Sequence, residues 1–128
     1  PLNSIWEGSG NVNALDLLRA LGKEPASLDA WLAEVGTVRG TDATFDAAVI
    51  GVLNQLARDP AQLEAQARLL AERMAMLLQG SVLIRHAPNA VADAFVATRL
   101  SPGGAPRTFG AYDTHIDVDT LIERAAPH

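Results

Sequence analysis

The chain of 128 residues has no cysteine and few aromatic residues, which make up 5% of it. Without cysteine there is no disulfide, thiolate metal site or cysteine nucleophile, so a zinc finger is excluded. No run of about 18 apolar residues could span a bilayer, and no charged-then-apolar stretch resembles a signal peptide. These absences predict a soluble, cytoplasmic protein.

Positive charge is also scarce, with 10 Lys and Arg against 15 Asp and Glu and a net charge of -5. A domain that binds nucleic acid through phosphates normally carries clustered Lys and Arg, so strong generic DNA binding is disfavoured. In contrast, alanine and leucine are abundant, and hydrophobic residues make up 48% of the chain. This composition favours helices and allows one domain's core.

The spacing of apolar residues predicts an all-α helical bundle of about five to six helices. A first, mostly buried helix is expected from Asn11 until Gly22 and Pro25 stop it. A second is expected to be capped by Ser27 and to end at Gly36. Its core positions recur at helical spacing and are Leu28, Trp31, Leu32 and Val35.

The middle of the chain predicts two further helices. One begins near Thr41 or Asp42 and ends at Asp59-Pro60. The next, the longest, is expected to run unbroken from Pro60 toward Arg85. The predicted inward residues of the two helices are Phe45, Val49, Val52, Leu53 and Leu56, then Leu63, Ala67, Leu70, Met74, Leu77 and Leu78. Glu64 and Arg68 are spaced for an i, i+4 ion pair.

A fifth helix is expected from about Asn89 to Leu100, followed by a loop to Thr114 and a short helix from about Asp117 to Ala125. We therefore divide the chain into a loop, residues 1–10, and a helical bundle domain, residues 11–128. Because the sequence opens with proline, we expect it to be a fragment of a longer protein.

One stretch stands out for its chemistry, the loop in which Glu7 lies between Trp6 and Gly8. In an apolar loop Glu7 could act as a general base, while Gly8 lets the backbone approach a ligand. The N–H groups from Ser9 to Asn11 would face an anion at the helix start. The alternative is an N-terminal cap with a solvated glutamate, because Gly-x-Gly alone is a weak phosphate signal.

The segment from Ile5 to Asn11, with the helix through Arg19, resembles the aromatic-Glu-Gly-Thr/Ser segment near the C-terminus of acyl-CoA dehydrogenases. It is most similar to the AidB-like branch, which is associated with the adaptive response to alkylation. Trp6 and Ser9 replace the commoner tyrosine or phenylalanine and threonine, which fits that branch. The resemblance implies that the chain is the C-terminal helical part of a flavoprotein whose flavin domains lie upstream.

The resemblance also implies roles for single residues. Glu7 would remove the alpha proton of an acyl-CoA substrate, and the beta hydrogen would leave as hydride to FAD. Gly8 would lie beside the thioester, and Arg19 would contact the CoA part. The residues implied for FAD binding are Ser9, Gly10 and Asn11. Arg19 lies roughly 12 Å along the helix from Asn11, so one long ligand could reach both ends.

Arg19 has two other interpretations. It could form an i, i+3 ion pair with Asp16, and in the AidB-like branch the matching arginine is associated with DNA. The second functional hypothesis is therefore a module for binding double-stranded DNA and for oligomerisation, with vestigial dehydrogenase activity. A third is a helical scaffold without chemistry. The family is usually dimeric or tetrameric, so a homo-oligomer is expected, with exposed stripes on the longest helix as its interface.

Weaker signals have ordinary explanations. A pattern of alternating potential metal ligands occurs at Asp113, His115, Asp117 and Asp119. It lacks the Gly and the distal Glu of a calcium loop, so we expect a solvated loop before an acid-capped helix. His86 is expected at a helix end. The scattered arginines predict a solvated face; they are Arg58, Arg68, Arg73, Arg85 and Arg99.

Overall fold

The computed structural model describes residues 17–19, 21–101 and 117–126, which contain helices and connections and no strand. Residues 17–19 and 21–23 are helical. The helices that follow are α2 (Pro25–Gly36), α3 (Ala43–Leu56), α4 (Pro60–Ala65), α5 (Ala67–His86), α6 (Asn89–Arg99) and α7 (Val118–Ala125). The predicted all-α fold is confirmed.

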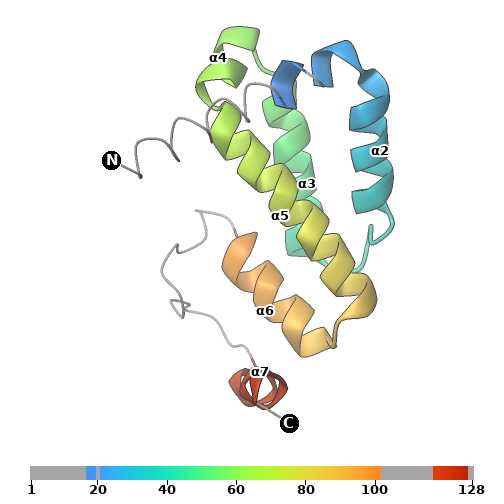
Figure 1. Ribbon diagram of the computed structural model, residues 1–128, viewed down its shortest axis with the longest axis vertical. Coiled ribbons are helices and arrows are strands. Elements are labelled where there is room, and N and C mark those ends of the chain that lie inside the picture. The colour runs from blue at the N-terminus through green and yellow to red at the C-terminus, as the bar shows by residue number, and fades with distance from the viewer. Residues whose placement is uncertain (1–16, 20, 102–116, 127–128) are drawn as a thin grey trace.

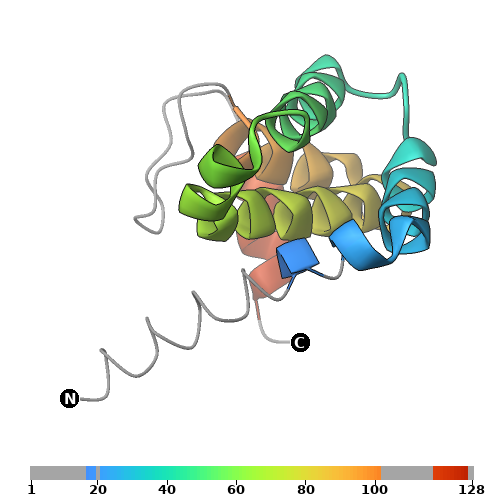
Figure 2. The same cartoon turned by 90° about the horizontal axis from the view of Figure 1, so that it is seen from above.

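The centre of the bundle is α5, because α2, α3, α4 and α6 all contact it. Figure 1 shows α5 crossing in front of α3, with α2 on one side and α6 on the other. Seen from above, α2 and α3 lie on different sides of α5 (Figure 2). α7 contacts α6 and lies at the end of the bundle away from α4.

The core forms where α3 and α5 face each other. Phe45, Leu70 and Leu77 are almost fully buried, and each such side chain contributes about 1.5–3 kcal/mol of burial free energy. The predicted start of this helix near Thr41 or Asp42 is confirmed, and Asp42 is its N-cap, because its carboxylate accepts a hydrogen bond of 2.9 Å from the Phe45 N–H. Two residues that were predicted to face inward, Leu53 and Leu78, are each 37% exposed, so the prediction was wrong at these positions.

The first predicted helix and the start of the second differ from the structure in detail. Leu17 and Leu18 are half-buried, not buried. The second helix begins at Pro25, so Ser27 is not its cap. Proline suits the first helical position, where its missing N–H would have no partner anyway. The Ser27 N–H instead donates to the Glu24 carbonyl inside the first turn.

The predicted longest helix is broken at Gln66, which separates α4 from α5. Gln66 has φ -110° and ψ 13°, outside the helical region. Its Oε1 accepts hydrogen bonds from Gln55 Nε2 at 3.1 Å and Arg58 Nη1 at 3.4 Å, which tie the break to α3. The predicted Glu64–Arg68 ion pair, whose spacing assumed an unbroken helix, is absent from the contacts of the described residues.

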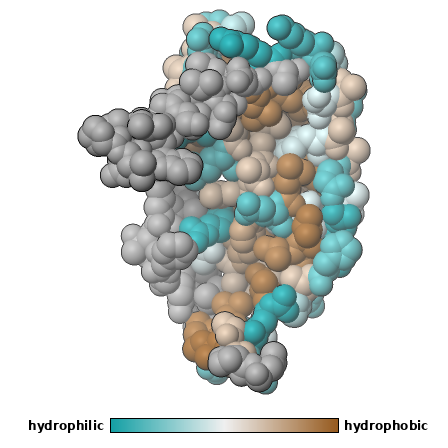
Figure 3. All heavy atoms as spheres, in the orientation of Figure 1, coloured by the Kyte–Doolittle hydropathy of each residue, from teal (hydrophilic) through white to brown (hydrophobic). Residues whose placement is uncertain are grey.

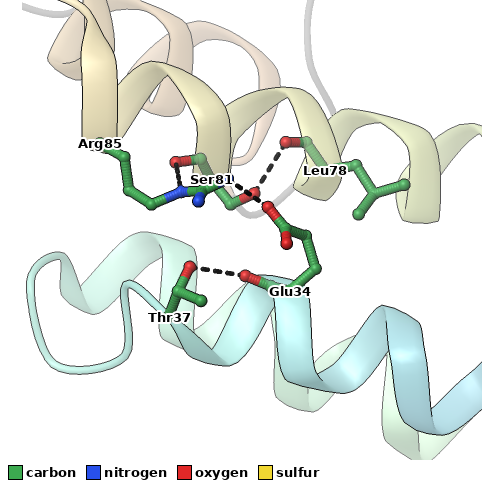
Figure 4. A network of polar contacts seen from close by, with 5 residues as sticks. All are labelled: Glu34, Thr37, Leu78, Ser81 and Arg85. Atoms are coloured by element: carbon green, nitrogen blue, oxygen red, sulfur yellow. Dashed lines mark hydrogen bonds and ion pairs between the residues drawn. The ribbon is translucent and has the colours of Figure 1, made fainter.

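Polar contacts join α2 to α5. The indole Nε1 of buried Trp31 donates to the Met74 carbonyl at 3.2 Å, which satisfies the polar atom of an otherwise apolar side chain. Near the C-terminal end of α5, Arg85 forms an ion pair with Glu34 of α2 (Figure 4). The buried Ser81 hydroxyl donates to the Leu78 carbonyl at 2.8 Å. The C-terminal half of α2 is thus joined to α5 by polar contacts at Trp31 and Glu34.

The last two helices match the prediction. α6 ends at Arg99, and Asp117 is the N-cap of α7, where its carboxylate accepts a 3.0 Å hydrogen bond from the Thr120 N–H. Two hydrogen bonds from Thr120 lower the pKa of Asp117: the bond from its backbone N–H has the larger effect and the bond from its hydroxyl the smaller. The acid-capped helix expected at this position is therefore present.

Candidate functional site

Most of the residues that the sequence singled out lie outside the part of the chain that the structure describes. They are Glu7, Gly8, Ser9, Gly10 and Asn11. The roles implied for them, and the loop at residues 1–10, stay predictions. Arg19 is the member of the predicted set that the structure places.

Arg19 is exposed and lies in the helical stretch before α2. It lines a groove of about 600 Å³, a size within the range of small-molecule sites. Four parts of the chain form the groove: the helical residues before α2, the start of α2, the end of α3, and α4. The residues lining it are Leu18, Arg19, Leu21, Gly22, Leu28, Leu56, Pro60, Leu63 and Glu64.

The lining of this groove is mostly leucine, with one basic and one acidic side chain, Arg19 and Glu64. Apolar walls favour the uncharged part of a ligand through burial, and a guanidinium favours phosphate or carboxylate. The arrangement therefore suits a molecule that combines an apolar part with an anionic group.

Sequence analysis did not find this groove. Leu56 and Leu63 were assigned to core stripes, and in the structure both are half-buried. The break at Gln66 makes α4 a separate six-residue helix, which brings Leu63 and Glu64 to the groove. The pattern contained no signal for that break, because neither glycine nor proline occurs at it.

The alternating Asp and His residues from Asp113 to Asp119 lie only partly within the described residues. Asp113 and His115 lie outside them, Asp117 is a helix cap, and no group of three potential metal ligands occurs in the described ranges. His86 lies in the last turn of α5, as expected for a helix-end residue.

The arginines of the predicted solvated face are engaged in different ways. Arg85 pairs with Glu34, whereas Arg58 and Arg73 donate to the glutamine amides of Gln66 and Gln55. Arg58, Arg68, Arg73 and Arg85 are exposed, and Arg99 is half-buried. The expectation of a largely solvated set is met in four of these five positions.

Apolar side chains also reach the surface. Figure 3 shows hydrophobic residues gathered on the face over α5 and its border with α2. On α5 itself Leu69, Leu78 and Val82 are 37%, 37% and 47% exposed. Leu78 and Val82 are four residues apart and share one side of α5, whereas Leu69, nine residues before Leu78, lies on the opposite side. The three residues therefore do not form one continuous stripe, and the homo-oligomer stays a prediction. No helix among the described residues is long and apolar enough to cross a membrane.

The chain is similar to the putative acyl-CoA dehydrogenase AidB of Escherichia coli (strain K12), with 36% identity over 107 residues, or 84% of this chain. The chain spans only 19% of the length of that relative. No protein-family model matches the chain, and no solved structure matches it.

Proposed function

Because the chain is homologous to a segment of AidB, an acyl-CoA dehydrogenase-type protein, we propose that it is the C-terminal helical part of an FAD-dependent acyl-CoA dehydrogenase-like enzyme. The reaction is the alpha,beta-dehydrogenation of an acyl-CoA thioester. The matched residues are 84% of this chain and only 19% of the relative, which supports assigning the flavin-binding domains to other parts of the protein.

The observation that carries the proposal is the position of Arg19. Its helix follows the Glu-Gly-Ser motif in the sequence, and its side chain lines an apolar groove that also carries a carboxylate, Glu64. A CoA thioester has phosphates that a guanidinium binds and a largely uncharged pantetheine and acyl part. The chemistry of the groove supports an acyl-CoA ligand near Arg19.

In this proposal Glu7 removes the alpha proton of the substrate, because that C–H is too weakly acidic to ionise without a base. Backbone N–H groups at Glu7 and Gly8 stabilise the charge that develops on the thioester oxygen. The bound flavin supplies the acceptor for the beta hydride. The residues assigned to flavin, Ser9, Gly10 and Asn11, lie outside the described residues.

The DNA-binding hypothesis receives less support from the described residues. The net charge is -5, and Arg85 is occupied by Glu34. Contacts to DNA phosphates release condensed counterions, which makes DNA binding strongly salt-dependent. A DNA-binding module would therefore show salt-sensitive affinity for duplex DNA that Arg19→Gln weakens, with no acyl-CoA oxidation.

The test uses the longer protein that contains this chain, with Glu7→Gln as the variant and Glu123→Gln, at an exposed position of α7, as the control. Flavin absorbance reports cofactor content, and its bleaching by acyl-CoA under anaerobic conditions reports the reaction. We expect Glu7→Gln to retain flavin and to slow bleaching by about 10²–10⁴-fold, the usual contribution of a general base. Glu123→Gln should keep the bleaching rate within a few-fold.

An unchanged bleaching rate in Glu7→Gln would show that Glu7 is not the base. Absence of bleaching in the unsubstituted protein with every acyl chain length would contradict the dehydrogenase proposal itself. In that case duplex DNA affinity at two salt concentrations tests the other function.

A further inference from the structure

A polar network joins the end of α3 to the break between α4 and α5, at the upper end of the bundle in Figure 1. At its centre is Gln55, which is only 3% exposed. Gln55 Nε2 donates to Gln66 Oε1 at 3.1 Å. A buried amide that keeps its hydrogen bonds holds a fixed orientation, because losing them leaves polar atoms unpaired.

Two exposed arginines are fixed to this pair of amides. Arg73 Nη1 donates to Gln55 Oε1 at 2.9 Å, and Arg58 Nη1 donates to Gln66 Oε1 at 3.4 Å. Neither guanidinium pairs with a carboxylate in the part of the chain that the structure describes. Arg85 differs from them, since Glu34 neutralises it.

We propose that Arg58 and Arg73 form an anion-binding site that takes a phosphate group. Each guanidinium has five N–H donors and uses one of them on a neutral amide, which leaves its charge uncompensated. Guanidinium donors match phosphate oxygens in geometry, and side chains held in place before binding lose less entropy when they bind. The site is separate from the groove at Arg19 and does not depend on the proposed enzymatic function.

Inorganic phosphate and ADP are the probes, titrated against the protein in low-chloride buffer. The readout is the NMR shift of the arginine Nε–H and glutamine side-chain N–H₂ signals. We expect saturable shifts at Arg58, Arg73 and Gln55. Tighter binding of ADP at the same signals would identify the source as a phosphate carried by a larger molecule, and equal binding would identify free phosphate.

Arg58→Gln removes one charge at an exposed position, and Arg73→Lys keeps a donor for the buried Gln55 carbonyl oxygen. Each should weaken phosphate binding about tenfold, because hydrogen bonds to charged groups are the stronger class. Arg68→Gln is the matched control, an exposed arginine on the same end of α5 with no contact to the glutamines. Thermal melting of each variant establishes that it folds.

Two results would overturn the assignment. One is the absence of saturable shifts at the arginine and glutamine signals in the unsubstituted protein. The other is an equal loss of phosphate binding in Arg68→Gln, which would show that overall charge is responsible and not a site built on Gln55.

Discussion

The two ends of α5 are built differently. At its C-terminal end, which we call the closed end, Phe45 packs against Gly80 and Arg85 pairs with Glu34. At its N-terminal end, which we call the open end, Arg58 and Arg73 hydrogen-bond neutral amides, and a mostly leucine-lined groove lies nearby. The closed end therefore carries a packed aromatic ring and a neutralised arginine, whereas the open end carries two arginines bonded to neutral amides beside a groove.

This difference separates residues that hold the bundle together from residues available to a ligand. A buried aromatic ring or a neutralised charge lowers the free energy of the folded chain alone. An open apolar groove and an uncompensated guanidinium lower it only when something binds. We therefore expect substitutions at the closed end to change stability and substitutions at Arg19, Arg58 and Arg73 to change binding.

The largest expected effect is at the closed end. Phe45→Ala removes a fully buried ring and leaves a cavity, so the free energy of unfolding should fall by about 3–5 kcal/mol. Ile50→Ala on the same helix is the control, because Ile50 is 57% exposed, and it should change the value by far less. Urea unfolding measures both variants. Similar losses would mean that the α3–α5 contact is not the core.

The polar network at the open end should show the next largest effect. Gln55→Ala removes the donor to Gln66 Oε1 and the acceptor of the Arg73 Nη1 hydrogen bond, and it should lower the free energy of unfolding by about 1–3 kcal/mol. Gln79→Ala, at an exposed position of α5, should be close to neutral. Equal thermal melting of the two variants would show that the network carries no stability.

Alanine substitutions at two helical glycines test how tightly α3 and α5 are packed at each position. A Cβ at Gly51 would meet nothing within 4 Å, so Gly51→Ala should stabilise by up to about 1 kcal/mol through helix propensity. A Cβ at Gly80 would lie 3.1 Å from Phe45 Cε2 and 3.4 Å from Leu100 Cδ1. Gly80→Ala should therefore stabilise less than Gly51→Ala or destabilise. The reverse order in denaturant unfolding would contradict tight packing at Gly80.

The smallest effect concerns α7, which contacts α6 beyond the closed end. The pKa of Asp117 is lowered from 3.8 by its bonds to Thr120, so the charged cap favours the folded helix above the ordinary pKa. That contribution is lost as the pH falls through the lower, folded-state pKa. The Thr120 amide signal should titrate with a midpoint below 3.8, and a midpoint at or above it would exclude the cap in solution.

Apolar spacing predicted much of the fold, because a stripe at helical period must be buried against something. It located α3, α6 and α7 and the acidic cap of α7 at Asp117. It missed the break at Gln66, since glutamine is a good helix former and the hydrogen bonds that hold the break come from Gln55 and Arg58, far along the chain. Non-local contacts of this kind leave no periodic signal.

The candidate site was predictable only in part. The motif around Glu7 led to a resemblance to the AidB-like branch, and the chain is 36% identical over 107 residues to AidB of Escherichia coli. Arg19 was selected because the resemblance implies that it contacts the CoA part, but the groove beside it depends on where the break at Gln66 places α4. Pattern alone cannot supply that position, because it is set by packing between helices.

The most direct test of the account is the steady-state kinetics of acyl-CoA oxidation by the longer protein with Arg19→Gln, compared with Arg68→Gln. If Arg19 binds the CoA part equally in the ground and transition states, KM should rise about tenfold while kcat stays within a few-fold. Arg68→Gln should leave both constants near their original values. An unchanged KM in Arg19→Gln would contradict the claim that the open end of this bundle meets the acyl-CoA substrate.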